Sequence, residues 1–355
     1  MKVTIQNVAK EAGVSITTVS RVINNNYPVS ISTREKVENA IEKLNFNPNL
    51  LARSLINSKT NTIGVIIPSI TNLFFPLVVK GIESELREQG YTIYLCDTDN
   101  NEDYEIDYTN SLLARQVDGI IVIDPSTKNI KSGFYEKVSK ELPLVCINGY
   151  SKGIKCNFVL NDEETGAIQA IEHLIELGHE KIALVRGENS YSYDLKEDIY
   201  VEIMKKYNFE SNIKIINIGN GNKDETTSMT IAKIMDELQK LKDVTAFFTC
   251  NDLMALGVIN ACKKLKLDVP KDISVIGFDN ISVASLVEPQ ITTVDQNMYD
   301  LGSKASKLLL ENIEKQVNNT QKVVLDTKLI IRESCERAKK ALYSDEIISD
   351  TQNLK

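Results

Sequence analysis

Short apolar runs alternate with helix-length stretches from residue 62 onward, and this alternation constrains the fold more than any other feature of the sequence. Runs this short and this apolar are typical of strands that are buried on both faces of a parallel sheet. The stretches between them, such as residues 74–89, 163–177 and 252–266, are long enough for covering helices. The pattern predicts a doubly wound α/β fold. The runs are TIGVIIP, YTIYLCDT, GIIVID, LPLVCIN, KIALVRG, VTAFFTC and ISVIGFD.

The α/β region is too long for one sheet of usual size, because it spans roughly 290 residues. Two subdomains are therefore expected, with a ligand held between them near the carboxyl ends of the strands. Polar residues stand where this rule requires them, directly after the apolar runs. They include Asp97, Asp99, Asn251, Asp252, Asp279 and Asn280.

Residues 4–24 carry a helix-turn-helix pattern ahead of the α/β region. Thr4 can cap a first helix, and Gly13 provides the permissive backbone where that helix must turn sharply. Ser15 can cap a second helix, whose inward face would carry Val19 and Val22. The spacing predicts two helices that pack at a steep angle, with the second presenting a polar outer face.

The outer face of the second helix is the candidate DNA-reading surface. In helix-turn-helix proteins such residues meet base edges in the major groove, where Arg21 can contact a guanine through two nitrogens and Ile16 can contact a thymine methyl group. The alternative is a small three-helix unit with a hydroxyl-rich surface and no role in DNA binding. The candidate DNA-binding residues of this segment are Thr4, Ser15, Ile16, Thr17, Thr18, Ser20, Arg21 and Asn24.

Charge is divided unevenly between the two regions. Residues 1–60 contain eight Lys and Arg against four Asp and Glu, although the whole chain carries a formal net charge of −8. A basic segment attracts phosphate, and an acidic body held away from the duplex does not prevent this. The distribution favours DNA binding by the N-terminal segment over the packing alternative.

Several other classes of protein are disfavoured by what the sequence lacks. The six cysteines form no C-x-x-C pair, and the two histidines have no metal-site spacing, so neither a metal nor a cofactor is expected. No glycine-rich phosphate loop or nucleophile elbow follows a strand, which argues against an enzyme. No apolar run is long enough for a membrane helix and no export segment begins the chain, so a cytoplasmic protein is expected.

Over residues 3–337 the sequence closely resembles the lactose-repressor (LacI/GalR) family of bacterial transcription regulators. The motifs that carry the resemblance are TIQNVAKEAGVSITTVSRVINN, NPNLLARSL, TIGVIIPSITNLFFPLVVKGIE, QVDGIIVI, ELGHEKIALV, NDLMALGVI and ISVIGFDN. The resemblance implies an all-α helix-turn-helix headpiece and an α/β core like periplasmic sugar-binding proteins, made of two doubly wound subdomains. It also implies a homodimer on palindromic double-stranded operator DNA.

The resemblance also implies domain boundaries. The headpiece would span residues 1–46, the hinge helix and linker 47–60, and the effector-binding and dimerisation core 61–337. Within the core, subdomain one would comprise about 61–160 and 291–322, and subdomain two about 161–290 and 323–337. Residues 338–355 would form a polar tail.

The segment from Asn47 to Leu55 resembles the family's hinge helix, which is too short to be stable alone and would fold on DNA against its partner hinge. By resemblance Leu55 is the side chain wedged into the central base step, while Ala52 and Arg53 lie close to the DNA. The alternative is that Leu55 only packs the linker. Family members often carry Lys after this Leu, whereas this chain has Ile56.

The effector-binding residues implied by the resemblance are Phe74, Phe75, Tyr193, Glu197, Phe248, Asn251 and Asp279. Aromatic faces and directional hydrogen bonds suit a sugar or a sugar derivative. Many relatives have an Arg where Glu197 is matched, so we expect a neutral or cationic effector and disfavour sugar phosphates. Two alternatives remain open: Lys196 or Arg186 can replace the Arg, or the match can be displaced by one residue.

Together these features predict a sequence-specific transcriptional regulator, with repression of carbohydrate-utilisation genes under control of a sugar-like effector. One alternative is control by a phosphorylated carrier protein bound to the helix at 74–89. Another is a sugar-binding protein without gene control, which would keep its role after deletion of residues 1–58.

Overall fold

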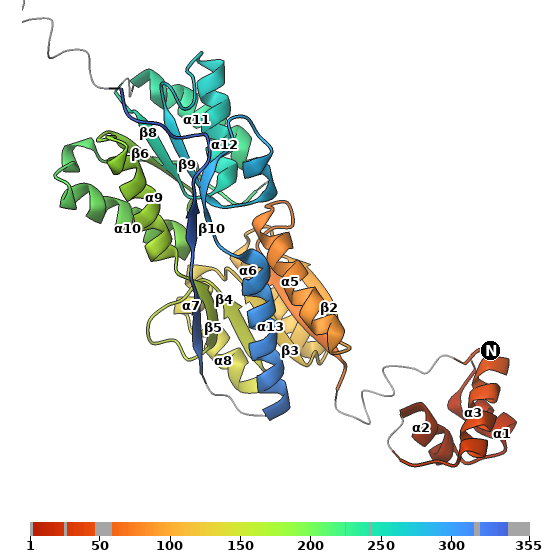
Figure 1. The fold of residues 1–355 in the computed structure, drawn as a ribbon. Coiled ribbons are helices and arrows are strands. Elements are labelled where there is room, and N and C mark those ends of the chain that lie inside the picture. The colour runs from red at the N-terminus through yellow and green to blue at the C-terminus, as the bar shows by residue number, and fades with distance from the viewer. Residues whose placement is uncertain are drawn as a thin grey trace, which may run out of the picture. The chain divides into compact units, whose positions relative to one another are not determined.

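The computed structural model describes residues 3–24, 27–46, 59–223, 225–240, 243–315 and 320–339. The chain divides into two compact units, Met1–Thr60 and Asn61–Lys355. Figure 1 shows the first unit as a small helical body and the second as a larger α/β body. Within the described residues no helix is long and apolar enough to cross a membrane.

The described part of the first unit forms the helices α1 (Ile5–Ala12), α2 (Ile16–Asn24) and α3 (Ile31–Lys43). They share a small apolar core that includes the fully buried Val8, Val19 and Val37. Gly13 ends α1 with a φ of 65°, a left-handed conformation that glycine adopts without strain. The turn that the sequence required between the two helices is therefore made at this glycine.

The second unit contains two six-stranded sheets. The first has the order β11-β5-β4-β3-β1-β2, and all of its pairs are parallel. Its strands are β1 (Thr62–Ile67), β2 (Thr92–Asp97), β3 (Gly119–Ile123), β4 (Leu144–Ile147), β5 (Asn157–Asn161) and β11 (Lys322–Leu325). The predicted doubly wound fold of two subdomains is confirmed by this sheet and the one that follows.

The second sheet has the order β12-β10-β9-β8-β6-β7, and only the β10–β12 pair is antiparallel. Its strands are β6 (Ile182–Arg186), β7 (Lys214–Asn217), β8 (Ala246–Thr249), β9 (Ser274–Asp279), β10 (Thr292–Asp295) and β12 (Lys328–Ile330). Five strands in the two sheets, β5, β7, β10, β11 and β12, are not among the apolar runs of the sequence. Most of these are short or carry exposed positions, which weakens the apolar signal.

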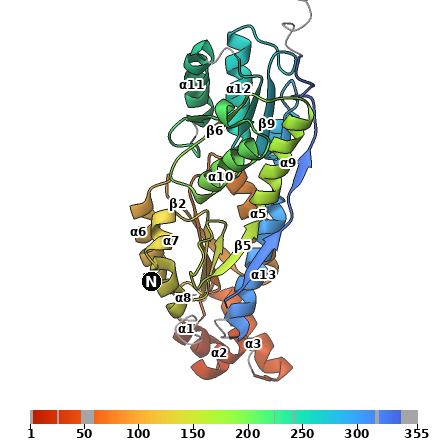
Figure 2. The same cartoon turned by 90° about the vertical axis from the view of Figure 1, so that its left-hand side faces the viewer.

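Helices cover both faces of the first sheet. One apolar cluster joins the sheet to α5 (Phe74–Glu88) and α13 (Met298–Lys315), and another joins it to α6 (Glu102–Ala114) and α8 (Phe134–Glu141), which α7 (Thr127–Lys131) adjoins. Figure 2 separates these two helix layers on either side of the strands. The α5–α13 contact is close, because a Cβ on Gly81 or Gly302 would lie 2.1 Å from a carbonyl oxygen of the other helix.

The second sheet is covered in the same way. Its helices are α9 (Glu163–Glu176), α10 (Tyr191–Lys206), α11 (Thr226–Lys240) and α12 (Asp252–Lys264), with short 3-10 turns at Glu210–Asn212 and Ser282–Ser285. Adjacent residues of β9 face opposite layers: Gly277 lies against Asp252 of α12, and Phe278 lies against Gly166 of α9. The strands are buried between the two layers, as expected for a doubly wound sheet.

Two expectations from the sequence are wrong in detail. The run YTIYLCDT is not buried on both faces, because β2 is an edge strand in which Tyr94 and Leu95 remain exposed. The subdomain boundaries also differ, since β10 pairs with β9 and β11 pairs with β5. Residues 292–295 thus belong to the second sheet and residues 322–325 to the first, so the chain crosses after Asp295 and after Leu325.

Candidate effector pocket and DNA-reading helix

Helix α2 presents the expected polar face. The Ser15 hydroxyl accepts a hydrogen bond from the Thr18 backbone N–H at 3.1 Å and so caps the helix. Ile16 is 46% exposed, and Thr17 and Arg21 are also exposed. The Arg21 guanidinium carbon lies 4.8 Å from the centre of the Tyr27 ring. An apolar side chain and a guanidinium are thus left at the surface of α2, where base edges can be reached.

The remaining candidate DNA-binding residues have different positions. Thr4 precedes α1, where its backbone N–H and its hydroxyl both donate to the Asn7 side-chain oxygen, at 2.9 and 2.7 Å. Ser20 is half-buried on α2, and Asn24 is the last residue of that helix. Ala52, Arg53 and Leu55 lie outside the described residues, so the hinge assignments stay predictions.

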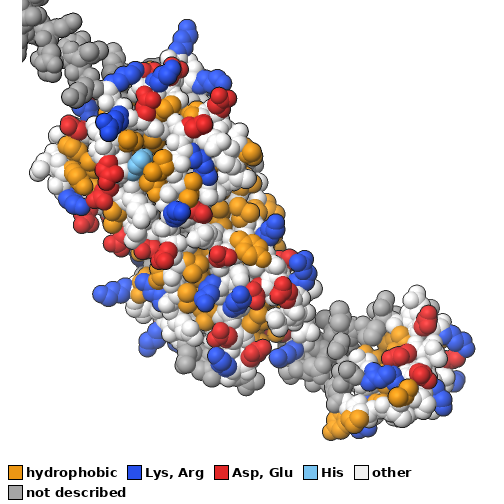
Figure 3. Space-filling model, in the orientation of Figure 1, with side chains coloured by type: hydrophobic (Ala, Val, Ile, Leu, Met, Phe, Trp, Pro, Cys, Tyr) orange, Lys and Arg blue, Asp and Glu red, His pale blue; other side chains and the backbone are white. Residues whose placement is uncertain are grey.

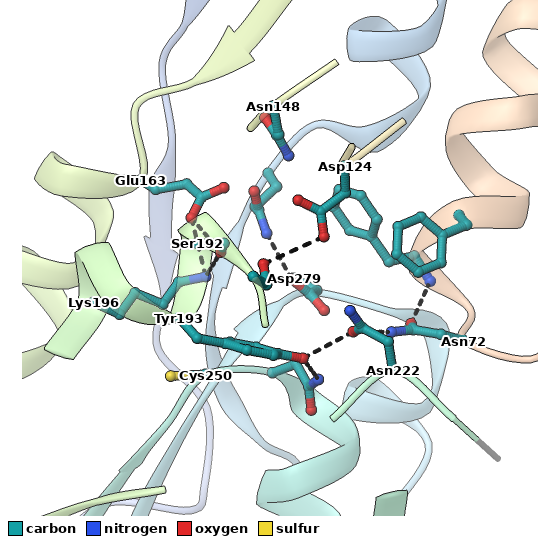
Figure 4. Close-up of a pocket in the computed structure, with 15 residues that line it drawn as sticks. Asn72, Asp124, Asn148, Glu163, Ser192, Tyr193, Lys196, Asn222, Cys250 and Asp279 are labelled. Atoms are coloured by element: carbon teal, nitrogen blue, oxygen red, sulfur yellow. Dashed lines mark hydrogen bonds and ion pairs between the residues drawn. The ribbon is translucent and has the colours of Figure 1, made fainter. Parts of the chain in front are cut away.

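A pocket lies between the two sheets, at the carboxyl ends of the strands. Figure 4 shows its polar side chains converging from both subdomains. This position follows from the topology, because loops that leave parallel strands meet at one edge of each sheet. The lining residues are Asn72, Phe74, Phe75, Asp124, Asn148, Glu163, Ser190, Ser192, Tyr193, Lys196, Asn222, Cys250, Asn251, Asp279 and Gln296.

Lys196 provides the positive charge of the pocket. Its side chain is 1% exposed, and its ammonium lies 3.2 Å from a Glu163 carboxylate oxygen and donates to the Ser192 hydroxyl at 2.6 Å. The same ammonium lies 3.9 Å from the centre of the Phe278 ring, an attractive cation–π geometry. Burial alone would lower the pKa of Lys196, but the nearby acidic groups, with Glu163 first among them and Asp279 also contributing, together outweigh it and raise that pKa.

Two aspartates face the pocket from opposite subdomains. Asp124 follows β3, and burial with nearby Glu163 raises the pKa of its carboxyl to about 7. Its one hydrogen bond that the structure shows comes from the Ser190 hydroxyl at 3.4 Å. Asp279 ends β9 and accepts from the Gln296 amide at 2.6 Å, and burial raises the pKa of this carboxyl well above its usual value.

A chain of hydrogen bonds crosses from one subdomain to the other behind the pocket. The Tyr193 hydroxyl donates to the Asn222 side-chain oxygen at 2.8 Å, and the Asn72 amide of the first subdomain donates to the same oxygen at 3.1 Å. The Tyr193 ring fits because Gly187 and Gly221 have no side chain: a Cβ there would lie 2.5 and 2.6 Å from it. Two further links join the same loop to the first subdomain, Asn100 to Asn220 and Asp99 to Lys223.

Five of the effector residues expected from the sequence line this pocket, and two do not. Those that do are Phe74, Phe75, Tyr193, Asn251 and Asp279. Phe248 is fully buried within β8, with its ring centre 6.4 Å from that of Phe278, because only the end of that strand reaches the pocket. Glu197 is not among the lining residues and pairs with Arg186.

The displacement at Glu197 has a simple geometric cause. One residue along a helix corresponds to a rotation of about 100°. Lys196 therefore faces the pocket from α10, while Glu197 faces Arg186 at the side, where Asp194 also pairs with that guanidinium at 2.6 Å. The alternative in which Lys196 replaces the Arg of relatives agrees with this geometry, and the repulsion of anions by Glu197 has no structural basis.

Sequence reasoning missed eight polar lining residues: Asn72, Asp124, Asn148, Glu163, Ser190, Ser192, Asn222 and Gln296. The sequence did contain a signal for Asp124 and Asn148, since these polar residues are the last residues of the apolar runs GIIVID and LPLVCIN. No comparable signal marks Asn222, which lies in the loop after the partly exposed β7. Among the described residues no group of three or more His, Cys, Asp and Glu is arranged to hold a metal ion.

Comparison with known proteins identifies the family. Residues 4–49 match the model for bacterial regulatory proteins of the lacI family, and residues 171–335 match the periplasmic binding protein-like domain. Catabolite control protein A of Priestia megaterium is 37% identical over 337 residues, covering 94% of this chain and 99% of that protein. The chain belongs to the lacI family.

Further relatives of this lacI-family regulator have named roles. The repressor PurR of Vibrio vulnificus is 34% identical, with 94% of this chain and 99% of that protein covered. A solved structure of the lac repressor dimer bound to operator and the anti-inducer ONPF has a TM-score of 0.84 at 29% identity, covering 95% and 100% of the two chains. This chain is a DNA-binding transcriptional regulator and not an enzyme.

One similar structure holds a small sugar. A LacI-family regulator from Enterococcus faecium with bound ribose has a TM-score of 0.69 at 27% identity, covering 78% of this chain and all of that one.

Proposed function

We propose that this regulator represses carbohydrate-utilisation genes as a homodimer on a palindromic operator, under control of a sugar-like effector. The observation that carries the proposal is the combination in one chain of an exposed reading helix with a pocket between two subdomains. Related regulators are described with operator DNA or with ribose bound. Because operator DNA lies in the cytoplasm, we place the protein there.

The pocket has the chemistry for a polyhydroxylated ligand. Phe74 and Phe75 offer apolar surface, while the amides of Asn72, Asn148 and Asn251 offer directional hydrogen bonds. A ligand bound here contacts both subdomains at once.

Such a ligand controls DNA binding only through a difference in affinity for two arrangements of the subdomains. The loop containing Asn220, Asn222 and Lys223 already joins the subdomains, and an effector in the pocket adds contacts to both walls. We propose that the resulting change in the first subdomain is transmitted through the hinge at 47–60 to the headpiece at 1–46. Effector binding then changes the spacing of the two headpieces of a dimer on the operator.

The test selects operator sequences from a random duplex library with the full-length protein and measures affinity by fluorescence anisotropy. We expect a palindromic site, and Arg21→Ala should cost about 1–3 kcal/mol and relax one base position in each half-site. Arg34→Ala on α3 is the matched control and should preserve the base preference. Selection of no common sequence, or an unchanged preference in Arg21→Ala, would contradict the assignment of α2 as the reading helix.

Leu55→Ala tests the hinge in the same assay. Removing a side chain that wedges into the central base step should weaken binding and reduce the bend of the operator. A variant that binds and bends the operator as the wild type does would leave Leu55 as a linker residue only.

A further inference from the structure

The pocket contains more carboxyl groups than cationic groups. Its lining includes the carboxyls of Asp124, Glu163 and Asp279, but only one ammonium, that of Lys196. Since burial strengthens each electrostatic interaction, an excess of carboxyls inside a pocket is costly unless something neutralises it. The balance of charge therefore restricts the ligand.

The charge of Lys196 is already engaged. Its ammonium contacts Glu163 and Ser192 and lies over the ring of Phe278, and among the described residues it donates no hydrogen bond to either aspartate. Asp279 accepts a strong hydrogen bond from the neutral amide of Gln296. Asp124 has the weakest support, a single contact of 3.4 Å to the Ser190 hydroxyl.

Asp124 stands where the pocket meets a larger hollow that leads outward. Asp124, Ser190 and Asn222 line both spaces. The hollow is also lined by Glu102, Glu105, Glu188 and Asp194, against Lys128 and Lys131. Lys128 pairs with Glu102, and Arg186 pairs with Asp194. On the face of the core that Figure 3 shows, acidic and basic side chains are interspersed.

We propose that the effector is a cation whose protonated amine pairs with Asp124, a refinement that rests on the sugar-like effector proposed above. An ammonium has three donors and can contact Asp124 while also reaching Ser190 or Asn148 across the pocket. A charge-assisted hydrogen bond of this kind is about twice as strong as a neutral one. An amino sugar combines this charge with hydroxyls for the asparagines. A phosphate or carboxylate on the ligand would face the same carboxyls and be repelled.

The test compares matched probes that differ only in the amine. The full-length protein is heated with glucose, galactose or mannose, with the corresponding 2-amino sugars, and with their N-acetylated forms, which keep the shape and remove the charge. At least one amino sugar should raise the Tm more than its hydroxyl and N-acetyl counterparts. Calorimetry of that probe should show about tenfold or more tighter binding than its neutral counterparts.

Two variants locate the effect. Asp124→Asn keeps the shape of the side chain and should abolish the preference for the amine. Asp198→Asn, an exposed carboxylate on the outer side of α10, removes the same formal charge and should retain the preference. A preference that persists in Asp124→Asn would overturn the role of Asp124.

The remaining outcomes distinguish this inference from the proposed function. Stabilisation by a neutral sugar that equals or exceeds that by its amine would overturn the cationic effector and leave a sugar-controlled regulator in place. No stabilisation by any probe would count against both the amine and the sugar class, whereas operator selection would still report on DNA binding.

Discussion

Two buried carboxyls in the core, Asp252 and Asp124, are held in opposite ways. Asp252 accepts the Thr293 hydroxyl at 2.6 Å and the Ile281 backbone N–H at 2.9 Å, so both of its oxygens have partners. Gly277 leaves the room for this, because a Cβ there would lie 2.1 Å from an Asp252 oxygen. Asp124 has one long contact, to Ser190.

Burial is not what separates these two carboxyls, because it raises the pKa of each to about 7. The difference lies in the partners that the fold supplies. Asp252 ties the start of α12 to the loop after β9 and to β10, all within the second subdomain. Asp124 faces an open pocket between subdomains. A buried carboxyl with complete partners is part of the scaffold, and one without them is available to a ligand.

Lys196→Met should have the largest effect on stability. It removes the ammonium from a buried pair and leaves Glu163 without its partner, which typically costs about 3–5 kcal/mol. Urea denaturation of the full-length protein near neutral pH measures the loss. The double variant Lys196→Met with Glu163→Gln should recover more than half of it. A single variant as stable as the wild type would show that the pocket carboxyls do not depend on this ammonium.

Asp252→Ala should come next, with a loss of about 2–4 kcal/mol, because two buried donors lose their acceptor. Asp252→Asn keeps the size and one acceptor oxygen and should lose less. The same denaturation experiment measures both. If Asp252→Ala were as stable as the wild type, the contrast between a scaffold carboxyl and a ligand-binding carboxyl would disappear.

The fold could be predicted from the sequence more fully than the pocket. The apolar runs predicted most of the sheet, and helical spacing placed Val19 inside and Ile16 outside in the headpiece. The pocket depends on residues brought together from distant loops. A shift of one position in matching this sequence to the family exchanges Lys196 for Glu197. Likewise, the residue type of Phe248 does not show whether its side chain lies inside a strand or at the strand end that reaches the pocket. Local periodicity shows which residues of a helix or strand are buried, but it does not show which residues from distant loops meet in a pocket.

Asp124→Asn should change stability in the opposite direction and with a specific pH dependence. The folded-state pKa of about 7 lies above the unfolded value of about 3.9, so the unfolded chain loses this proton first, and the wild type loses stability as the pH rises from about 4 to about 7. Glu163 and Glu105 oppose its ionisation, and Lys196 favours it. Relative to the wild type, Asp124→Asn should therefore gain stability progressively between about pH 4 and about pH 7, by at most a few kcal/mol, and gain no more above pH 7.

Thermal unfolding of both proteins across this pH range measures the difference. Asp198→Asn, which is exposed, should show no such trend. A difference between Asp124→Asn and the wild type that does not vary with pH would mean that Asp124 stays ionised throughout, satisfied by the fold as Asp252 is.

Tyr193→Phe should give the smallest change in global stability. It tests contacts between the subdomains, in contrast to the contacts of Asp252 within one subdomain. The contacts of Asp252 stay within one subdomain, whereas the Tyr193 hydroxyl shares the Asn222 oxygen with Asn72 of the other subdomain. Phe keeps the ring against Gly187 and Gly221 but loses the hydrogen bond donated to Asn222 and a long one, 3.4 Å, accepted from the Asn251 amide, for a cost of about 1 kcal/mol. We call residues 219–223 the cleft loop. If the bond from Tyr193 to Asn222 holds this loop in place, amide hydrogen exchange at residues 219–223 should become about fivefold faster in the variant.

Exchange in β8, which lies in the same subdomain but outside this chain of hydrogen bonds, should be unchanged. Tyr207→Phe, at the exposed end of α10, is the matched control because its hydroxyl contacts only Glu172 among the described hydrogen bonds. Faster exchange confined to the cleft loop would identify Tyr193 as a residue that holds the two subdomains together. Equal acceleration in β8 would instead make Tyr193 part of the scaffold, like Asp252, and would leave the effector to supply the closing contacts alone.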